Sequence, residues 1–326
     1  MAVCIAGMHR SGTSMVAKIL HTSGLYLGPE TDLAPRNPGM FEDHWENKRF
    51  VKINAGIISR FYGSWDAPPQ IPEDWRDARL SPFLQDARGV LNAFEGHGPW
   101  GWKDPRNCLT LPFWQSLLDP LPVILVVRNP LEVAKSLRER NGFSLALGLT
   151  LWNAYNQHVC AAVAPPMRIV THYDMFFQDP ERELSRLLNF LRFPMNDEMI
   201  ARVRSVHDAQ LRHHQMSTAD LQAADVDPAI IDLYRDLCRE AGWIDDTARR
   251  ATNAPVPAAG GDDWDDPDES DFTLSREARI VKSGRTSRRR QREETDARIA
   301  ELEQTVASLR RALAEAKGFD SAFVAP

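Results

Sequence analysis

The segment Gly7–Ser14, which reads GMHRSGTS, constrains this chain more than any other. An apolar run, Val3 to Ala6, precedes it and an apolar-rich segment, Met15 to Leu20, follows it, so the sequence predicts a strand, a glycine turn and a helix. Successive N–H groups of such a turn and the positive end of the helix dipole form an anion site. The segment therefore predicts a phosphate-binding loop between the first strand and the first helix.

One residue of this loop departs from the common nucleotide-triphosphate pattern, G-x-x-x-x-G-K-[ST]. Thr13 stands where that pattern has a lysine that reaches the outer phosphates. A cation is found instead three residues earlier, at Arg10. The loop is thus suited to an anion, and the sequence argues against a magnesium-bound triphosphate.

A second anion site is predicted where the apolar run from Pro122 to Val127 ends in Arg128. Ligands of open α/β sheets lie at the carboxyl ends of parallel strands, and Ser136 follows two turns into the next helix. A guanidinium and a hydroxyl can clamp one phosphate. Helix capping beside an exposed arginine is the alternative explanation. In ATP-hydrolysing loop proteins an aspartate that helps hold magnesium often ends this strand, so Arg128 favours a phosphate over a metal.

Residues 1 to 250 are expected to form one α/β domain, a P-loop-like parallel β-sheet with helices on both faces, because apolar runs alternate with helical patterns. Asn129 and Asp179, each followed by proline, predict helix starts, with Glu132 completing a box-like start for the first. Four leucines at helical spacing predict one buried face in the second of these helices. The expected strands are Val3–Gly7, Pro99–Lys103, Pro122–Val127 and Arg168–Thr171, and the leucines are Leu184, Leu187, Leu188 and Leu191.

The composition changes beyond residue 250. Residues 251–285 combine a stretch rich in Pro, Ala and Gly with an acidic run and the start of a basic run, which predicts a disordered linker. Residues 286–318 predict a C-terminal helix whose apolar residues recur every three or four positions, typical of a short coiled coil that would make a homo-oligomer. A lone solvated helix is the alternative. The seam residues are Ile299, Leu302, Val306, Leu309 and Leu313.

Overall composition excludes several classes of protein. A net charge of −6 over 326 residues gives no general case for nucleic-acid binding. No apolar run approaches the roughly 20 residues of a membrane helix, and a strand starting at residue 2 leaves no room for a secretory signal. The four cysteines are scattered without a C-x-x-C pair, so we expect them to be reduced and buried. We therefore expect a cytoplasmic protein without an integral membrane segment.

The two anion motifs together resemble the signatures of sulfotransferases that use 3′-phosphoadenosine-5′-phosphosulfate (PAPS). In that family a loop K/R-S-G-T-[ST] holds the 5′-phosphosulfate, and a segment R-N-P-x-x-x-x-x-S holds the 3′-phosphate. This chain has RSGTS at 10–14, and RNP at 128–130 followed by Ser136. The resemblance covers roughly residues 1 to 245, and the segments 37–43 and 101–106 are similar to those of bacterial members that act on carbohydrates or other small metabolites.

This resemblance implies PAPS as the co-substrate, no metal, and an acceptor hydroxyl, with a saccharide as the expected acceptor. Arg10 would lie beside the bridging oxygen and stabilise the charge that builds on the departing phosphate. Its guanidinium does not deprotonate, so it acts by its fixed charge. The implied cofactor-binding residues are Arg10, Ser11, Gly12, Thr13, Ser14, Arg128 and Ser136.

The acceptor hydroxyl also needs a general base within hydrogen-bond reach. Glu42 is the first candidate, since bacterial members resemble this chain in placing a glutamate near an aromatic residue; a surface carboxylate is the alternative. His44 and Asp104 are further candidates, although Asp104, between Lys103 and Arg106, is equally well explained as a salt-bridged structural residue.

Two other functions remain compatible with the sequence. A P-loop nucleotide or sugar kinase is disfavoured by Thr13 and Arg128, which replace a phosphate-binding lysine and a metal-binding aspartate. A non-catalytic adaptor that works through its C-terminal coiled coil is the second alternative.

Overall fold

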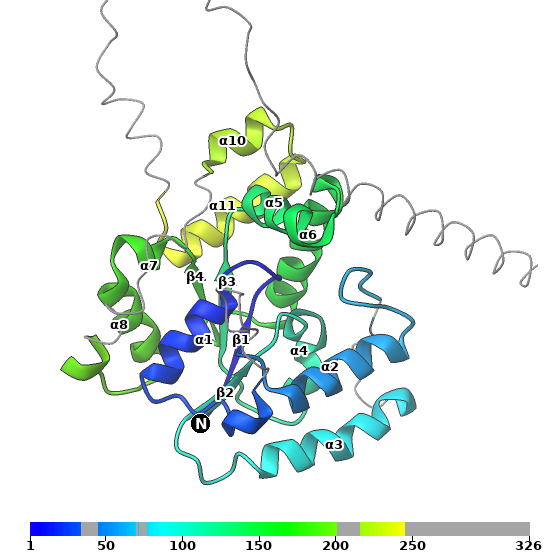
Figure 1. Ribbon diagram of the computed structural model, residues 1–326, viewed down its shortest axis with the longest axis vertical. Coiled ribbons are helices and arrows are strands. Elements are labelled where there is room, and N and C mark those ends of the chain that lie inside the picture. The colour runs from blue at the N-terminus through cyan, green and yellow to red at the C-terminus, as the bar shows by residue number, and fades with distance from the viewer. Residues whose placement is uncertain (34–44, 70, 72–76, 201–215, 245–326) are drawn as a thin grey trace, which may run out of the picture. The chain divides into compact units, whose positions relative to one another are not determined.

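The computed structural model describes residues 1–33, 45–69, 71, 77–200 and 216–244, which all belong to a compact unit spanning Met1–Pro255 (Figure 1). The predicted linker and C-terminal helix lie outside the described residues, as do Glu42 and His44.

A sheet of four parallel strands forms the centre of this unit, as the alternation of apolar runs predicts. The strands are β1 (Ala2–Ala6), β2 (Trp100–Lys103), β3 (Val123–Val127) and β4 (Arg168–His172), in the order β2-β1-β3-β4. Each lies within one residue of its expected bounds at either end. β1, β2 and β3 are buried over their whole lengths, which explains why β1 and β3 appear in the sequence as continuous apolar runs.

Helices cover both faces of the sheet, so the predicted fold class is confirmed. Alternate residues of β1 face opposite layers: Val3 and Ile5 pack in one core cluster, and Cys4 and Ala6 pack in the other. The first layer contains α1 (Thr13–Thr22), α7 (Met175–Gln178) and α8 (Pro180–Phe190). The second contains α2 (Lys48–Arg60), α3 (Ser81–Asn92), α4 (Asn107–Gln115), α5 (Pro130–Asn141), α6 (Leu145–Ala162), α10 (Thr218–Ala223) and α11 (Pro228–Ala241).

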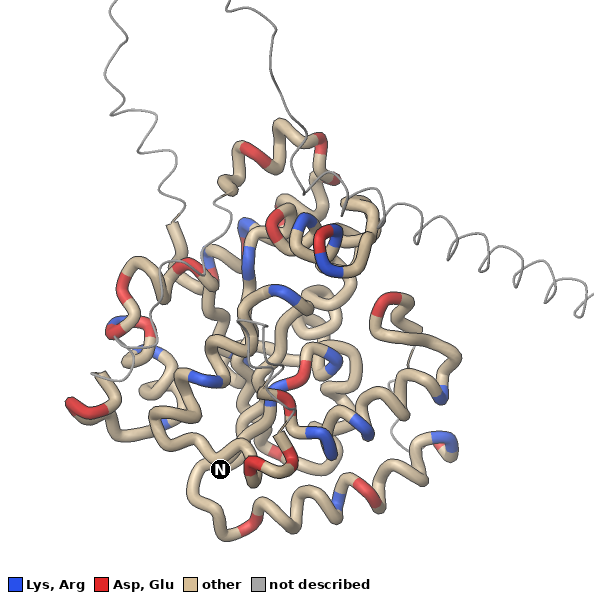
Figure 2. Tube along the Cα trace, viewed as in Figure 1, with Lys and Arg blue, Asp and Glu red and all other residues tan. Residues whose placement is uncertain are grey.

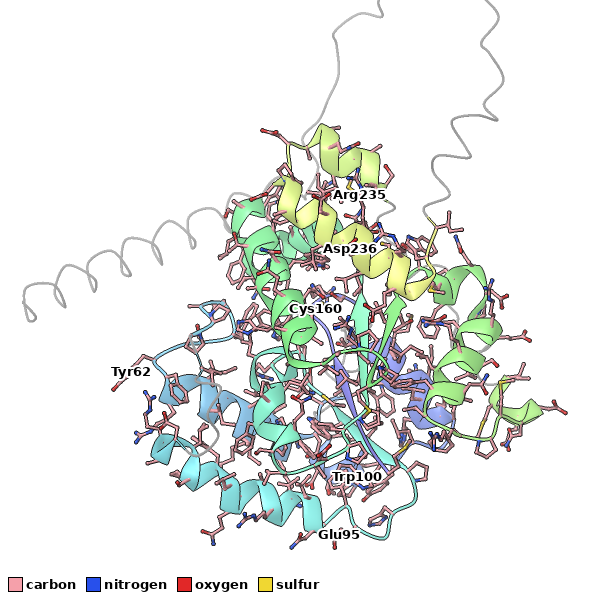
Figure 3. The ribbon with its side chains drawn as sticks, turned by 180° about the vertical axis from the view of Figure 1, so that it is seen from behind. Tyr62, Glu95, Trp100, Cys160, Arg235 and Asp236 are labelled. Atoms are coloured by element: carbon pink, nitrogen blue, oxygen red, sulfur yellow. The ribbon has the colours of Figure 1, made fainter. Side chains whose placement is uncertain are left out.

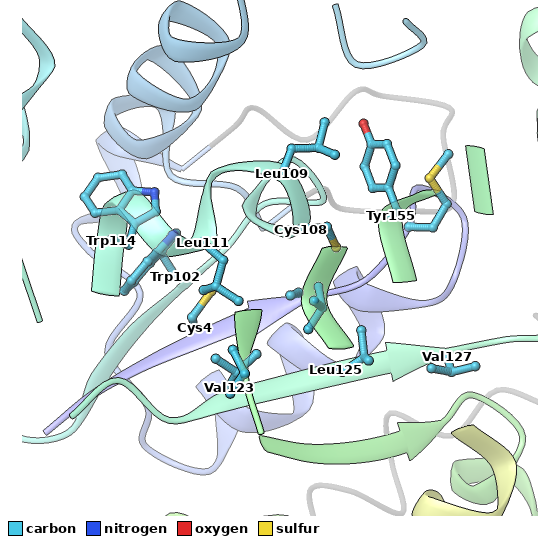
Figure 4. Close-up of a cluster of buried hydrophobic side chains, with 14 of the residues drawn as sticks. Cys4, Trp102, Cys108, Leu109, Leu111, Trp114, Val123, Leu125, Val127 and Tyr155 are labelled. Atoms are coloured by element: carbon cyan, nitrogen blue, oxygen red, sulfur yellow. The ribbon is translucent and has the colours of Figure 1, made fainter. Parts of the chain in front are cut away.

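The second layer contains most of the aromatic side chains of the core. Figure 4 shows Cys4, Val123 and Leu125 of the sheet beneath α4, with Trp102 and Trp114 packed at one end of the cluster. Trp102 and Trp114 are fully buried, and their indole N–H groups donate to Asn107 and Asn54 over 2.9 and 2.8 Å. These tryptophans therefore belong to the core.

Two helix starts form where the sequence predicts them, but one detail differs. The Asn129 side chain accepts from the Leu131 N–H over 2.9 Å, and the Asp179 side chain accepts from the Arg182 N–H over 3.0 Å. The expected box at the start of α5 does not form: Glu132 bonds to Arg128 and to the Met216 N–H instead. A buried arginine and a backbone donor from elsewhere in the chain thus compete successfully for this carboxylate.

The predicted buried face of α8 is confirmed, and the prediction for the cysteines is corrected. All four leucines of α8 and its end, Leu184, Leu187, Leu188 and Leu191, are buried. The four cysteines are free thiols, but Cys160 and Cys238 are only half-buried, whereas Cys4 and Cys108 are fully buried. Burial raises the pKa of the Cys108 thiol to about 12, so this thiol stays protonated and unreactive.

Basic and acidic residues are interspersed along the described trace (Figure 2). Among the helices that the structure describes, none combines the length and the apolar character needed to cross a membrane.

Candidate anion-binding site

The strand order places the two predicted anion motifs side by side. β1 and β3 are neighbours, with Ala6 opposite Leu125, so the loop after β1 and the segment after β3 leave the same edge of the sheet. From β1 the chain continues to β2 on one side, and from β3 it continues to β4 on the other. Ligands of open α/β sheets bind at such a switch point.

Two glycines allow the loop to pass close to its neighbours. A Cβ atom at Gly7, where φ is +151°, would lie 2.5 Å from the Val126 carbonyl oxygen. At Gly12, where φ is +92°, it would lie 2.3 Å from the Tyr173 ring. Backbone packing at these two positions requires glycine, which explains the G-x-x-x-x-G spacing.

The loop leads into the N-terminus of α1, which none of the described side chains caps. The first bond of the helix runs from the Val16 N–H to the Gly12 carbonyl over 3.2 Å, so the preceding amides have no helical acceptor. The Ser11 N–H donates to the Met8 carbonyl over 3.1 Å, so this amide does not point at an anion in the loop. The Ser11 hydroxyl is buried, and its oxygen has no hydrogen-bond partner among the residues that the structure describes. An anion held in the loop would supply an acceptor for that hydroxyl.

Arg10 extends from the loop to Ser136, the last residue of the neighbouring motif. It has a positive φ of 70°, and its Nε donates to the Ser136 hydroxyl of α5 over 2.8 Å. The structure therefore brings together two residues that lie 126 positions apart and that the sequence assigns to different phosphates.

Lys103, at the carboxyl end of β2, is a second cation beside the loop. Its ammonium is buried and donates to the Ser14 hydroxyl over 3.0 Å and to Glu46 over 2.8 Å. Burial lowers the pKa of Lys103, and the Glu46 carboxylate opposes that shift. Lys103 thus places positive charge against the first turn of α1.

Arg128 is held on three sides. Its Nε donates to the buried Glu132 carboxylate over 2.7 Å, and its Nη1 lies 3.4 Å from the Arg10 carbonyl oxygen. The guanidinium carbon lies 4.5 Å from the centre of the Tyr173 ring. Since the guanidinium carries five N–H donors, most of them remain for an anion at the switch point.

Asp104 lies at the end of β2 but faces the core. Its carboxylate is fully buried and accepts from the Arg106 Nε over 2.9 Å and from the Asn54 amide over 2.9 Å. The Arg106 backbone N–H donates to it as well, over 3.0 Å. These bonds favour the structural explanation of Asp104 over a role as base.

His9 is a residue of the loop to which the sequence gives no role. Its ring centre lies 4.5 Å from that of Trp65, and its buried Nε2 has no hydrogen-bond partner within the described part of the chain. Burial lowers the pKa of His9 well below its usual value, and the positive charges of Arg106 and Lys103 lower it further. The imidazole is therefore neutral at physiological pH.

Two acidic residues of the site, Glu46 and Glu132, were not predicted from the sequence to be part of it. Glu46 and Lys103 are far apart in the sequence, so no local spacing pattern indicates that they are in contact. Glu132, considered only as part of a capping box, follows Arg128 by four residues, and this helical spacing could have indicated the ion pair. In the described part of the chain, no three His, Cys, Asp or Glu side chains group in a way that could hold a metal ion.

Comparison with known proteins identifies one family. The family model described as "Sulfotransferase family" matches residues 2–197. A curated relative from Caenorhabditis briggsae, described as a "putative protein-tyrosine sulfotransferase", is 25% identical over 237 residues, which cover 68% of this chain and 72% of the relative.

Solved structures of similar chains carry the same description at lower identity. The sulfotransferase domain of the Synechococcus PCC 7002 olefin synthase is 19% identical, with 79% of this chain and 89% of that chain covered and a TM-score of 0.40. A mouse sulfotransferase in complex with PAP is 13% identical, with 78% and 89% covered and a TM-score of 0.39.

Proposed function

Since this chain belongs to the sulfotransferase family and is an enzyme of that class, we propose that its sulfuryl donor is PAPS and that its acceptor is a hydroxyl group of a saccharide or another small metabolite. The reaction converts PAPS and an alcohol into 3′,5′-bisphosphoadenosine, a sulfate ester and a proton.

The observation that best supports this donor is the pairing of two cations at neighbouring strand ends. Arg10 and Arg128 approach each other closely enough that Arg128 Nη1 lies 3.4 Å from the Arg10 carbonyl. PAPS carries anionic groups at two positions of one nucleotide. Two separate arginines can bind one group each, whereas a loop for a triphosphate binds phosphates at a single position. The buried Ser11 hydroxyl without an acceptor also fits an anion in the loop.

In this proposal PAPS, when bound, supplies a sulfuryl group attached to a phosphate leaving group. The residues Arg10, Ser11, Gly12, Thr13 and Ser14 hold the 5′ end, and Arg128 and Ser136 hold the 3′-phosphate. Arg10 stabilises the charge that develops on the departing oxygen, and its bond to Ser136 fixes the direction of the guanidinium. Lys103 adds positive charge through Ser14. No metal takes part.

We propose Glu42 as the base that accepts the proton of the acceptor, with His44 and Asp104 as alternatives. Support for Glu42 comes from its place in the sequence, four residues before Glu46, whose carboxylate accepts from Lys103 over 2.8 Å. Asp104 is the weakest candidate, because both of its oxygens already accept hydrogen bonds.

A saccharide acceptor is supported by an aromatic surface beside the loop. Trp65 is half-buried, stacks on Phe143 with ring centres 5.6 Å apart and lies against His9. Sugar rings pack their C–H faces on such side chains. We expect Trp65→Ala to raise the KM for the acceptor about tenfold with a smaller effect on the KM for PAPS, as the loss of one stacking contact implies.

Tyr62 provides a matched control for that variant. Tyr62 is close to Trp65 in the sequence, but its side chain points away from the protein (Figure 3) and is 97% exposed. Tyr62→Ala should leave both KM values unchanged. Equal effects of the two substitutions would contradict the placement of the acceptor on Trp65.

Cytoplasmic residence belongs to the same proposal. Support comes from the four free cysteines, which suit a reducing compartment.

Radiosulfate transfer from labelled PAPS to a panel of saccharides, phenols, lipids and tyrosine peptides tests the function. We expect transfer to at least one class by the wild type and a rate about 100-fold lower in Arg10→Ala. Transfer to tyrosine peptides alone would replace the proposed acceptor, and a non-catalytic adaptor would show no transfer to any of them.

A further inference from the structure

The segment that starts α5 does more than supply Arg128. It also binds a stretch that is distant in sequence, Met216–Ser217, which directly precedes α10. Figure 1 shows α10 close to α5 at one end of the sheet. Asn129 and Glu132 make three hydrogen bonds to this stretch, and Lys135 of α5 adds a fourth from its Nζ to the Met216 Sδ over 3.3 Å.

Glu132 uses both of its carboxylate oxygens. Oε2 accepts from the Arg128 Nε over 2.7 Å, and Oε1 accepts from the Met216 N–H over 2.8 Å. The side chain is fully buried. A buried carboxylate is stable only when charge and hydrogen bonds compensate its desolvation, and here a guanidinium and an amide do so together.

Asn129 also acts in two directions. Its Oδ1 caps α5 by accepting from the Leu131 N–H over 2.9 Å. Its Nδ2 donates to the Met216 carbonyl over 3.0 Å and lies 3.4 Å from the Ser217 carbonyl. Asn129 therefore donates to the Met216 carbonyl, and Glu132 accepts from the Met216 N–H, so both backbone groups of Met216 are hydrogen-bonded to the start of α5.

Glu132 and Tyr173 both contact the Arg128 guanidinium. Glu132 occupies the Nε edge, and Tyr173 covers one face of the guanidinium at 4.5 Å. The Nη atoms therefore point toward the loop, where Nη1 meets the Arg10 carbonyl at 3.4 Å. Without Glu132 the guanidinium would lose its strongest fixed partner and could rotate about its last bonds.

We infer that Glu132 is a positioning residue, which orients Arg128 toward an adenosine 3′-phosphate and makes that orientation depend on the docking of Met216–Ser217. This inference rests on the proposed function. It assigns Glu132 no contact with the nucleotide: its effect passes through Arg128.

Ligand selectivity separates positioning from a merely structural role. Calorimetry on the full chain would compare 3′,5′-bisphosphoadenosine with adenosine 5′-phosphate, which lacks the 3′-phosphate. We expect Glu132→Gln to weaken binding of the bisphosphate about tenfold and to leave the monophosphate nearly unchanged, because a charged hydrogen bond orienting Arg128 is lost. Equal losses for both ligands, or no loss, would overturn the inference.

A double-mutant cycle tests the route through Arg128. In the Arg128→Ala background, Glu132→Gln should have no further effect on bisphosphate binding, since the group that it orients is absent. Additive losses in the double variant would show that Glu132 acts by another path and would refute the positioning role.

Glu183 offers a matched control. It is a buried carboxylate that accepts from the Arg186 Nε over 2.9 Å on α8, in the opposite layer. Glu183→Gln should lower the melting temperature without changing the ratio of the two affinities. A change in that ratio as large as the one in Glu132→Gln would count against a specific role for Glu132.

A second variant keeps the test usable if Glu132→Gln folds poorly. Asn129→Ser keeps an oxygen that caps α5 and removes the amide that donates to Met216. We expect a selective, smaller loss of bisphosphate affinity; unchanged affinity would overturn the link to Met216. If the wild type binds no bisphosphate at all, the proposed function itself fails. If the wild type binds it and Glu132→Gln binds it equally well, only the positioning role of Glu132 is refuted.

Discussion

Arg10 and Arg128 meet at one edge of the sheet but are held in different ways. Arg10 belongs to the loop and bonds through its side chain to a neutral hydroxyl, that of Ser136. Arg128 is buried against a carboxylate and an aromatic ring. A guanidinium on the loop that would hold the leaving group is suited to stabilising charge there, whereas one fixed against a buried carboxylate and a ring is suited to recognition.

This difference predicts separate kinetic effects. Arg10→Ala should lower turnover about 100-fold, as expected for loss of a preorganised charge at the leaving group, with a smaller change in bisphosphate affinity. Arg128→Ala should weaken bisphosphate binding about tenfold or more. Steady-state kinetics and calorimetry of both variants measure these values. Equal losses of turnover with unchanged affinity would contradict the assigned roles.

His9 predicts a pH dependence of stability. Its pKa in the folded state is lowered below the value of 6.5 in the unfolded chain, so the unfolded state binds more protons as the pH falls. The free energy of unfolding should therefore decrease below about pH 6.5, by at most roughly 1.4 kcal/mol per pH unit for this one group. Denaturant unfolding of the wild type and of His9→Gln between pH 5 and pH 8 tests this. A wild-type decrease no steeper than that of the variant would refute it.

At the scale of elements, local patterns in the sequence were sufficient to predict the sheet. Buried parallel strands are apolar on both faces, and proline after Asn129 or Asp179 marks a helix start, so the bounds could be placed to within a residue. The partners of the charged residues could not be predicted in this way. Lys103 meets Ser14 across 89 positions, and Glu132 meets Met216 across 84, so these bonds depend on how the elements pack.

The same reason explains why the sequence left two roles open for Asp104, a general base or a structural residue. Its position after a strand suggests a site residue, yet packing turns it toward Asn54 of α2 and toward the core. Arg10 and Ser136, by contrast, were predicted as parts of two phosphate sites, and only the adjacency of β1 and β3 reveals their direct bond.

The glycine loop predicts the effect of one substitution. Gly12→Ala would place a Cβ atom 2.3 Å from the Tyr173 ring, which lies against Arg128. We expect displacement of Tyr173 and a loss of bisphosphate affinity of about tenfold, comparable to the loss of one well-oriented contact. Gly96→Ala is the matched control, because Gly96 also has a positive φ, 81°, but an added Cβ meets nothing within 4 Å. If both variants bind the bisphosphate equally well, the close contact of Gly12 with Tyr173 is unimportant for the site.

At the scale of the whole molecule, the family match and the described elements lie in the N-terminal part of the chain. The match ends at residue 197, and the last described helix, α11, ends at Ala241. The domain bounds 1–250, 251–285 and 286–318 therefore remain a prediction from composition. A polar, proline-rich junction tolerates truncation when no core element depends on it.

Deletion of residues 252–326 tests this division. We expect the shortened chain to stay soluble and folded, and to bind the bisphosphate like the full chain. Light scattering of both proteins would show whether the C-terminal region also causes self-association, as the predicted coiled coil implies. An insoluble or unfolded fragment would show that the boundary is wrong.

Arg10 and Arg128, at adjacent strand ends, are proposed to form a PAPS site. Calorimetric titration of the wild type with 3′,5′-bisphosphoadenosine and, separately, with magnesium ATP is the sharpest test. We expect saturable binding of the bisphosphate, weakened in Arg128→Ala, and much weaker binding of magnesium ATP. Tight binding of magnesium ATP with none of the bisphosphate would contradict this proposal and would favour a kinase.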